Sequence, residues 1–304
     1  MKVDDTLYKL GASFDFRQCF LVGITNFSFI FLLLLGHIVF RVLLLLYVMP
    51  LEQAVFGTML LRYPDTVSTF VGTTFWALVW YAGHKFYAVN KLLEEPYKHI
   101  YRRFESDDFG TFLQKKFHVT SFNMALCRHF LNGSDRKSFI QIIKHVHLEI
   151  TLVTKDLNDI YGQSMLMHLG IDFVLFTSCF YMLYGLSTQA HTETRLFIIA
   201  MMALSWIVPF LLRVLLIIDV CESVTNEAKR TGQRIYHFTH SEEDSEFSDE
   251  IKEFGLQLYN CPVHFSPVGF FTLGYEFMGS FLGTVLTYLI ILIQMDKGSR
   301  LQLR

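Results

Sequence analysis

Charged residues are scarce in this chain, and their scarcity limits the class of protein that it can be. Only 18% of its 304 residues are charged, whereas 52% are hydrophobic and the mean hydropathy is +0.35. The net charge of −2 provides no overall basic surface of the kind that nucleic-acid-binding proteins carry. We therefore expect a membrane protein with no nucleic-acid partner.

Cysteine and catalytic motifs are also sparse. The five cysteines are odd in number and none are spaced as CxxC, which argues against both a disulfide framework and a zinc site. The pairs His145-x-His147 and His237-x-x-His240 have no third ligand at zinc-like spacing. The chain also lacks GxSxG, a phosphate-binding glycine loop and a carboxylate pair within an apolar segment. We expect no enzyme activity, no cofactor and no metal site.

Long apolar segments are what the chain has in abundance. A helix needs about 20 apolar residues to cross roughly 30 Å of hydrocarbon. Five segments qualify, which predicts an all-α, polytopic transmembrane protein with spans at about 19–49, 69–90, 164–187, 195–219 and 268–294. The first run is most simply one long tilted helix, with a break near Gly36 as the alternative. The residues at 50–68 include Pro50 and Pro64 and are predicted to form a short loop.

Two long regions between the spans, at 91–163 and 220–262, are more polar than the spans themselves. The first holds eleven Lys and Arg residues, and its apolar positions Ile140, Ile143, Val146/His147 and Ile150 recur every three or four residues. This period predicts amphipathic helix outside the bilayer. The segment "EIKEFGLQLYN" predicts a further short helix before the last span. The whole chain, 1–304, is expected to form one receptor or channel domain.

Lysine and arginine counts predict the orientation, because short basic loops stay in the cytoplasm. Three lie at the N-terminus, eleven at 91–163 and four at 220–262, against one at 50–68 and one at Arg195. The N-terminus and both large loops are therefore expected inside and the C-terminus outside. The tail, with Lys297, Arg300 and Arg304, runs against this bias.

The last apolar segment, "GTVLTYLIILIQMD" at 283–296, carries polar residues inside the run. Positions seven apart on an α-helix fall within about 20° of each other, so Thr287 and Gln294 share a face, which Gly283 and either Ile291 or Ile290 complete. An unpartnered amide is costly in lipid, so Gln294 is expected to face protein or water. Two interpretations stay open: hydrogen bonding between helices, or the lining of an aqueous pore.

The same segment resembles the signature of the insect gustatory receptor family. "TYLIILIQM" contains Thr287, Tyr288, five hydrophobic residues and Gln294, with Met295 where that family usually has Phe. Upstream, "CESVTNEAKRTGQRIYH", "FSPVGFFTL", "LNDIYGQSMLMHLG" and "KFYAVNKLL" resemble further segments of the family in the same order. The resemblance extends from about residue 69 onward.

The resemblance implies a seven-helix fold with a cytoplasmic N-terminus. The count of Lys and Arg residues independently predicts the same orientation. It also implies a ligand-gated cation channel in the plasma membrane, a homo- or heterotetramer with related subunits whose last helices surround the pore. Gln294, Thr287 and Ile291 would then line the pore, and Tyr288 would pack against a neighbouring helix. The expected partners are a small-molecule tastant, the lipid bilayer and related receptor subunits.

Aligned from the C-terminus, the first two spans resemble the third and fourth helices of the family, so its first two helices have no counterpart here. Ligand contacts are expected in the outer halves of the other spans. The candidates are Arg41, Tyr47, Phe75, Trp76, Tyr181, Tyr184 and Trp206. The alternative for each aromatic residue is core packing or a place in an interfacial belt.

Two other functions compete with a conducting channel. A heptahelical receptor coupled to G proteins requires an extracellular N-terminus, which the charge bias and the span count oppose. A non-conducting truncated subunit that assembles with full-length relatives is the second alternative.

Charged residues within the spans are functional hypotheses by default. Arg213, however, is expected to extend toward the same cytoplasmic interface as Asp219.

Overall fold

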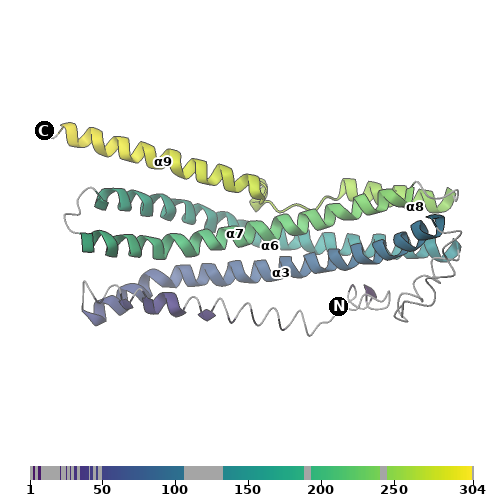
Figure 1. The fold of residues 1–304 in the computed structure, drawn as a ribbon, viewed down its shortest axis with the longest axis horizontal. Helices are drawn as coiled ribbons and strands as arrows, with labels where there is room; N and C mark the ends of the chain where they lie inside the picture. Colours follow the sequence, from purple (N-terminus) through teal and green to yellow (C-terminus); the bar gives the residue numbers. More distant parts are fainter. Residues whose placement is uncertain are drawn as a thin grey trace. The chain divides into compact units, whose positions relative to one another are not determined.

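The computed structural model describes residues 50–105, 133–187, 193–239 and 245–302, with isolated positions before residue 50. These residues form helices and short connections, without a strand among them, which confirms the all-α class. The elements in Figure 1 are α3 (Leu51–Glu105), α6 (Gly133–Ser187), α7 (Glu193–Thr239), α8 (Ser245–Asn260), the 3-10 turn η1 (Pro267–Gly269) and α9 (Tyr275–Gln302).

Helix α3 begins earlier than its prolines suggest. It starts at Leu51, directly after Pro50, and continues through Pro64. The expectation of a loop at 50–68 is therefore wrong. A proline just before or at the start of a helix costs little, because the first N–H groups have no intrahelical partner. An interior proline removes one hydrogen bond, and neighbouring helices can support the backbone that it frees. Helix α7 likewise continues through Pro209.

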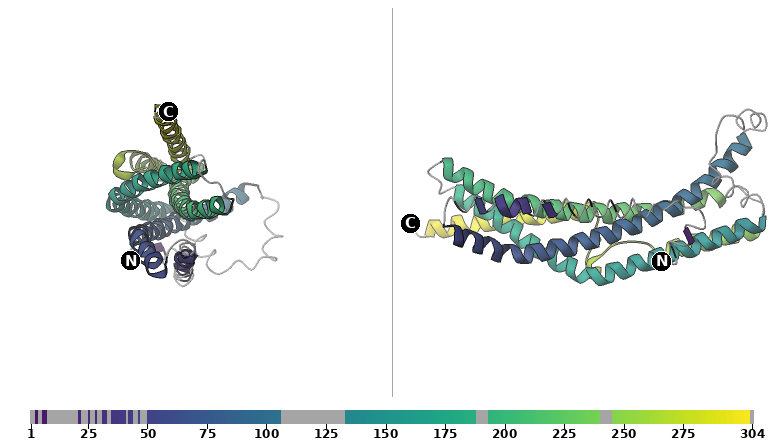
Figure 2. Two further views of the ribbon diagram at one scale, coloured as in Figure 1. Left: turned by 90° about the vertical axis from the view of Figure 1, so that its left-hand side faces the viewer. Right: turned by 90° about the horizontal axis from the view of Figure 1, so that it is seen from below.

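The chain divides into two compact units, and α3, α6 and α7 each contribute residues to both. Each of the three is a single helix, and Figure 2 shows the fold from two further directions. Unit 1 comprises Met1–Arg17, Val79–Leu157 and Ser223–Phe265. Unit 2 comprises Gln18–Leu78, Asn158–Glu222 and Ser266–Arg304.

The core of unit 1 follows the apolar period of the sequence. Ile140, Ile143, Val146, His147 and Ile150 of α6 are all buried, which confirms the predicted amphipathic helix. The His147 ring lies between two phenylalanine rings, with centroid distances of 5.0 Å to Phe86 of α3 and 5.7 Å to Phe254 of α8.

Charged residues join α6 and α8 at the edge of this core. Lys144 Nζ donates to Glu250 and to Glu253, each at 2.8 Å, and Gln141 donates to Glu250 at 2.6 Å. The hydrogen bond from Lys144, supported by that from Gln141, lowers the pKa of the Glu250 carboxyl. Polar pairs therefore hold the short helix α8 on α6.

Three helices within the described residues are long and apolar enough to cross a membrane. These segments are Lys137–Gly185, Ala203–Tyr236 and Tyr275–Asp296, with mean hydropathies of 1.6, 2.2 and 1.8 in their most apolar stretches. They overlap the expected spans in α6, α7 and α9. The expected span at 69–90 lies in α3, which is not among the three, and the one at 19–49 lies mostly outside the described residues.

Candidate functional site

Helix α9 packs by one face only. Phe281 and Val285 are buried, whereas Thr287, Ile291 and Gln294 are exposed. At 100° per residue, Gln294 and Thr287 lie about 160° and 140° from the midpoint of Phe281 and Val285, on the opposite side of the helix, and Ile291 lies about 100° from it, on the flank. Only 11% of the most apolar stretch of α9 is buried, against 39% for α7, so α9 has a large surface free for lipid, water or another copy of the chain.

The polar groups on the exposed face differ in how they are satisfied. The hydroxyl of Thr287 donates to the carbonyl of Gly283 in its own helix at 2.9 Å, and Thr284 donates to Ser280 at 2.8 Å. These hydroxyls therefore tolerate an apolar environment. The amide of Gln294 has four hydrogen-bonding positions and is exposed. If this part of α9 lies in hydrocarbon, the Gln294 amide requires water or protein as a hydrogen-bonding partner.

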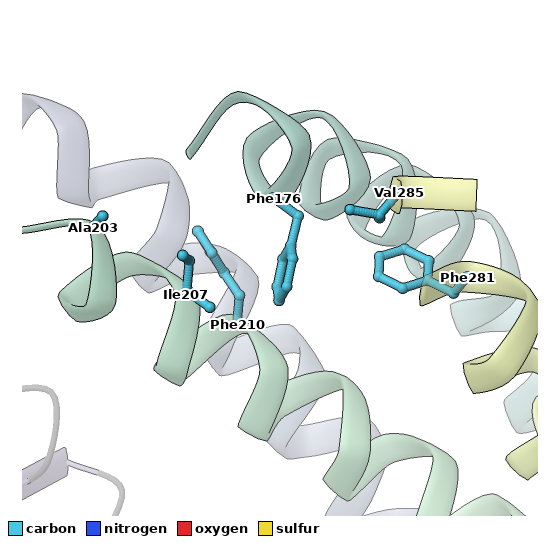
Figure 3. Packing of buried hydrophobic residues seen from close by; sticks show 6 residues of the cluster. All are labelled: Phe176, Ala203, Ile207, Phe210, Phe281 and Val285. Atoms are coloured by element: carbon cyan, nitrogen blue, oxygen red, sulfur yellow. The ribbon is translucent and has the colours of Figure 1, made fainter. Parts of the chain in front are cut away.

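Aromatic side chains hold the other face of α9 against α6 and α7. Figure 3 shows the buried cluster, which is formed by Phe176 of α6, Ala203, Ile207 and Phe210 of α7, and Phe281 and Val285 of α9. The ring of Tyr288 contacts Phe173 of α6 edge-on, with centroids 5.5 Å apart. In lipid such contacts act through van der Waals packing, and each aromatic pair contributes about 0.5–1.5 kcal/mol. Tyr288 therefore contacts α6 although its side chain is 51% exposed, and Met295, seven residues further on, is 66% exposed.

The expected ligand-contacting residues are distributed over three helices. Phe75 of α3 is 1% exposed and its ring lies 5.5 Å from that of Tyr161, as a core residue would. Trp206 stacks on Phe210 at 5.8 Å beside the buried cluster. Trp206 is partly buried, as are Trp76, Tyr181 and Tyr184. Arg41 and Tyr47 lie outside the described residues.

A polar cluster links three helices of unit 2 beside the aromatic one. Arg213 of α7 donates to the carboxylate of Asp172 on α6 and, at 3.5 Å, to the hydroxyl of Thr69 on α3. One turn from Asp172, His168 Nδ1 lies 2.9 Å from the hydroxyl of Ser68. The expectation that Arg213 extends to the membrane surface is therefore wrong, because a buried carboxylate on the adjacent helix is its partner.

Sequence reasoning missed Asp172 altogether. A motif of two carboxylates within a span does not describe this pair, which has opposite charges and comes from different helices. The available signal was a single acidic residue in the apolar run "HLGIDFVLF", since an intramembrane carboxylate needs a partner. The guanidinium of Arg213 also lies 5.1 Å above the Phe210 ring, so the charge pair touches the cluster that holds α9.

Comparisons with known proteins agree on one group of relatives. A family model described as a 7tm chemosensory receptor matches residues 1–298. Gustatory receptor 68a of Drosophila melanogaster is 24% identical over 191 residues, covering 61% of this chain and 46% of that protein. The gustatory receptor for bitter taste 66a of the same organism is 30% identical over 161 residues, covering 51% and 30%. The chain thus spans less than half the length of these curated relatives.

A solved structure shares the fold. The insect olfactory receptor OR5 from Machilis hrabei superimposes with a TM-score of 0.59 at 13% identity, covering 92% of this chain and 68% of that one. At this identity the likeness concerns the fold alone.

Proposed function

We propose, from the premise that this chain belongs to the 7tm chemosensory receptor family, that it is a gustatory-receptor-like subunit of a ligand-gated cation channel. The pore is lined by α9 and the ligand is a small-molecule tastant. Ligand binding favours the open arrangement through its higher affinity for that arrangement.

The observation that carries this proposal is the exposed face formed by Thr287, Ile291 and Gln294 of α9. Amides from several copies form a hydrated ring that partly replaces the water shell of a cation. The aliphatic Ile291, one turn away, supplies a constriction that loses its water when narrow. The buried cluster on the opposite face attaches α9 to α6 and α7 of its own subunit.

Self-association is part of the proposal, because one helix cannot enclose a pore. Four copies, as the family resemblance implies, would place four Gln294 amides around one axis. The exposed large apolar residues that then face lipid or neighbouring subunits are Leu282, Leu286, Ile290 and Met295.

Cysteine accessibility in expressing cells tests the pore face. Three variants are treated with a cationic, membrane-impermeant methanethiosulfonate: Thr287→Cys, Ile291→Cys and Gln294→Cys. Current is recorded before and during application of sugars and bitter compounds. Val285→Cys, which is buried on the opposite face, is the matched control, and the unmodified chain corrects for native cysteines. We expect block at the three exposed positions only. Equal effects at position 285, or absence of any cation current, would overturn the proposal.

Localisation and orientation follow from the charge bias. We propose a multi-pass plasma-membrane protein with its N-terminus in the cytoplasm and its C-terminus outside. An epitope tag after residue 304 should stain intact cells, and the sequon at Asn132 should carry no glycan. A tag that is visible only after permeabilisation, with Asn132 glycosylated, contradicts this orientation.

A further inference from the structure

The connection from α8 to α9 contains a strained turn (Figure 1). The N–H of Phe270 donates to the carbonyl of Pro267 at 3.1 Å, while Val268 has φ 52° and ψ 26° and Gly269 has φ 76°. Positive φ at both central residues, with this hydrogen bond, matches a type I′ turn, whose central positions normally hold Gly, Asn or Asp. Val268 is the one non-glycine residue with positive φ in the described part of the chain. A β-branched residue in this conformation is an outlier that its surroundings must maintain.

Contacts with helix α6 hold the turn at Val268 on one side. The side-chain oxygen of Asn158 accepts a hydrogen bond from the N–H of Ser266 at 2.8 Å. One helical turn further on, a Cβ at Gly162 would lie 3.3 Å from the backbone nitrogen of Val268 and 3.8 Å from Pro267 Cα. Asn158 and Gly162 therefore form one docking face on α6, and the absence of a side chain at Gly162 lets the two backbones meet.

Helix α7 holds the chain just beyond the turn. The hydroxyl of Tyr275, the first residue of α9, donates to Asp219 at 2.6 Å. A Cβ at Gly274 would approach the carboxylate of Glu222 to 2.7 Å. The side chain of Val268 itself is exposed, so these neighbouring contacts, and not its burial, keep the turn in place.

We infer that residues Ser266–Gly269 form a docked turn that sets the position of α9, with Asn158 and Gly162 of α6 and Asp219 of α7 as its positioning residues. When the docking contacts are lost, Val268 relaxes to negative φ and the path of the chain into α9 changes. The turn therefore has two discrete arrangements, and a displacement of α6 or α7 selects between them. That this selection gates a pore rests on the proposed function; the docking itself does not.

Hydrogen exchange of the purified full-length chain in lipid nanodiscs tests the docking. Asn158→Leu removes the acceptor, and Asn158→Asp retains one and is the conservative control. Loss of one hydrogen bond corresponds to about a fivefold change in an opening equilibrium. We therefore expect amides of residues 266–280 to exchange about five times faster in Asn158→Leu and at the wild-type rate in Asn158→Asp. Amides of residues 165–185 should be unaffected in both.

A substitution at Val268 tests the strain independently of the docking contacts. Asn tolerates the left-handed conformation, so Val268→Asn should slow exchange across the same amides. Gly162→Ala should accelerate it, because the added methyl group separates the two backbones. Equal exchange in Asn158→Leu and Asn158→Asp, or faster exchange in Val268→Asn, would overturn the docked turn.

Current recordings separate this inference from the proposed function. Where the wild type conducts, Asn158→Leu should change the resting current and Asn158→Asp should restore it. An exchange pattern as expected without wild-type current refutes the channel and leaves the docked turn supported. If the wild type conducts but amides of residues 266–280 exchange at the same rate in Asn158→Leu as in the wild type, the docked turn alone is refuted. Altered exchange with unaltered current refutes its role in gating.

Discussion

Removing one member of the Arg213–Asp172 pair should destabilise the protein far more than removing both. The side chains are 13% and 3% exposed, so neither charge reaches bulk water when the other is lost. Breaking a buried pair from one side costs about 3–5 kcal/mol, whereas replacing both members with apolar residues of similar size is often neutral. Asp172→Leu and Arg213→Met should therefore each lower the free energy of unfolding by about 3–5 kcal/mol, and the double variant by less than either.

The measurement is the free energy of unfolding in lipid nanodiscs, obtained by steric trapping for the wild type, both single variants and the double variant. Arg230→Met is the matched control: its partner Glu227 lies three residues away on the same helix, and Arg230 is 61% exposed. Glu227 is 12% exposed but keeps a hydrogen bond from the Asn90 amide at 3.0 Å, so losing the exposed Arg230 should cost less than about 1 kcal/mol. If the two single effects simply add in the double variant, the charges do not depend on each other and the reasoning fails.

Three further outcomes follow from contacts in the structure. Gly83→Ala should destabilise the protein by about 1–3 kcal/mol, because the added Cβ would lie 2.7 Å from Val224 Cγ2. Gly170→Ala, whose added Cβ would have nothing within 4 Å, should stabilise the protein by about 0.5–1 kcal/mol. Thermal unfolding measures both effects. The lowered pKa of Glu250 means that its stabilising contribution is present above the unfolded-state value of about 4.3 and is lost as pH falls through the folded value; Glu250→Gln should remove that part of the pH dependence of stability between pH 6 and 3. Tyr288→Leu should lose about 1 kcal/mol of packing against Phe173, while Tyr288→Phe should not, and an equal loss in both would show that the hydroxyl matters instead.

Helix faces could be predicted where the spacing of residues along the sequence determines them. The spacing of Ile140, Ile143 and Ile150 correctly predicted the buried face of α6, because a period of 3.6 residues is written in the sequence itself. The spacing of seven between Thr287 and Gln294 predicted a shared face of α9, and both residues are exposed, but the spacing did not predict that exposure. Pro64 led to a wrong boundary for α3, because the cost of an interior proline favours a loop, whereas the helix continues through this residue.

Pairings between distant residues could not be predicted in this way. Asp172 and Arg213 are 41 residues apart, and either charge alone is compatible with several partners until the helices are placed side by side. The left-handed Val268 had no sequence signal at all, since valine disfavours that conformation. It is held by Asn158 and by the backbone at Gly162, more than 100 residues earlier in the chain.

Single-channel recording from the purified chain in a planar bilayer tests the central claim most directly. If the face of α9 that carries Gln294 lines a cation pore, the wild type should show unitary cation currents. Gln294→Glu, which places a carboxylate on each copy, should then raise the preference for Ca²⁺ over K⁺. Absence of unitary currents, or currents whose selectivity is the same in Gln294→Glu as in the wild type, would contradict the proposal that α9 forms the pore.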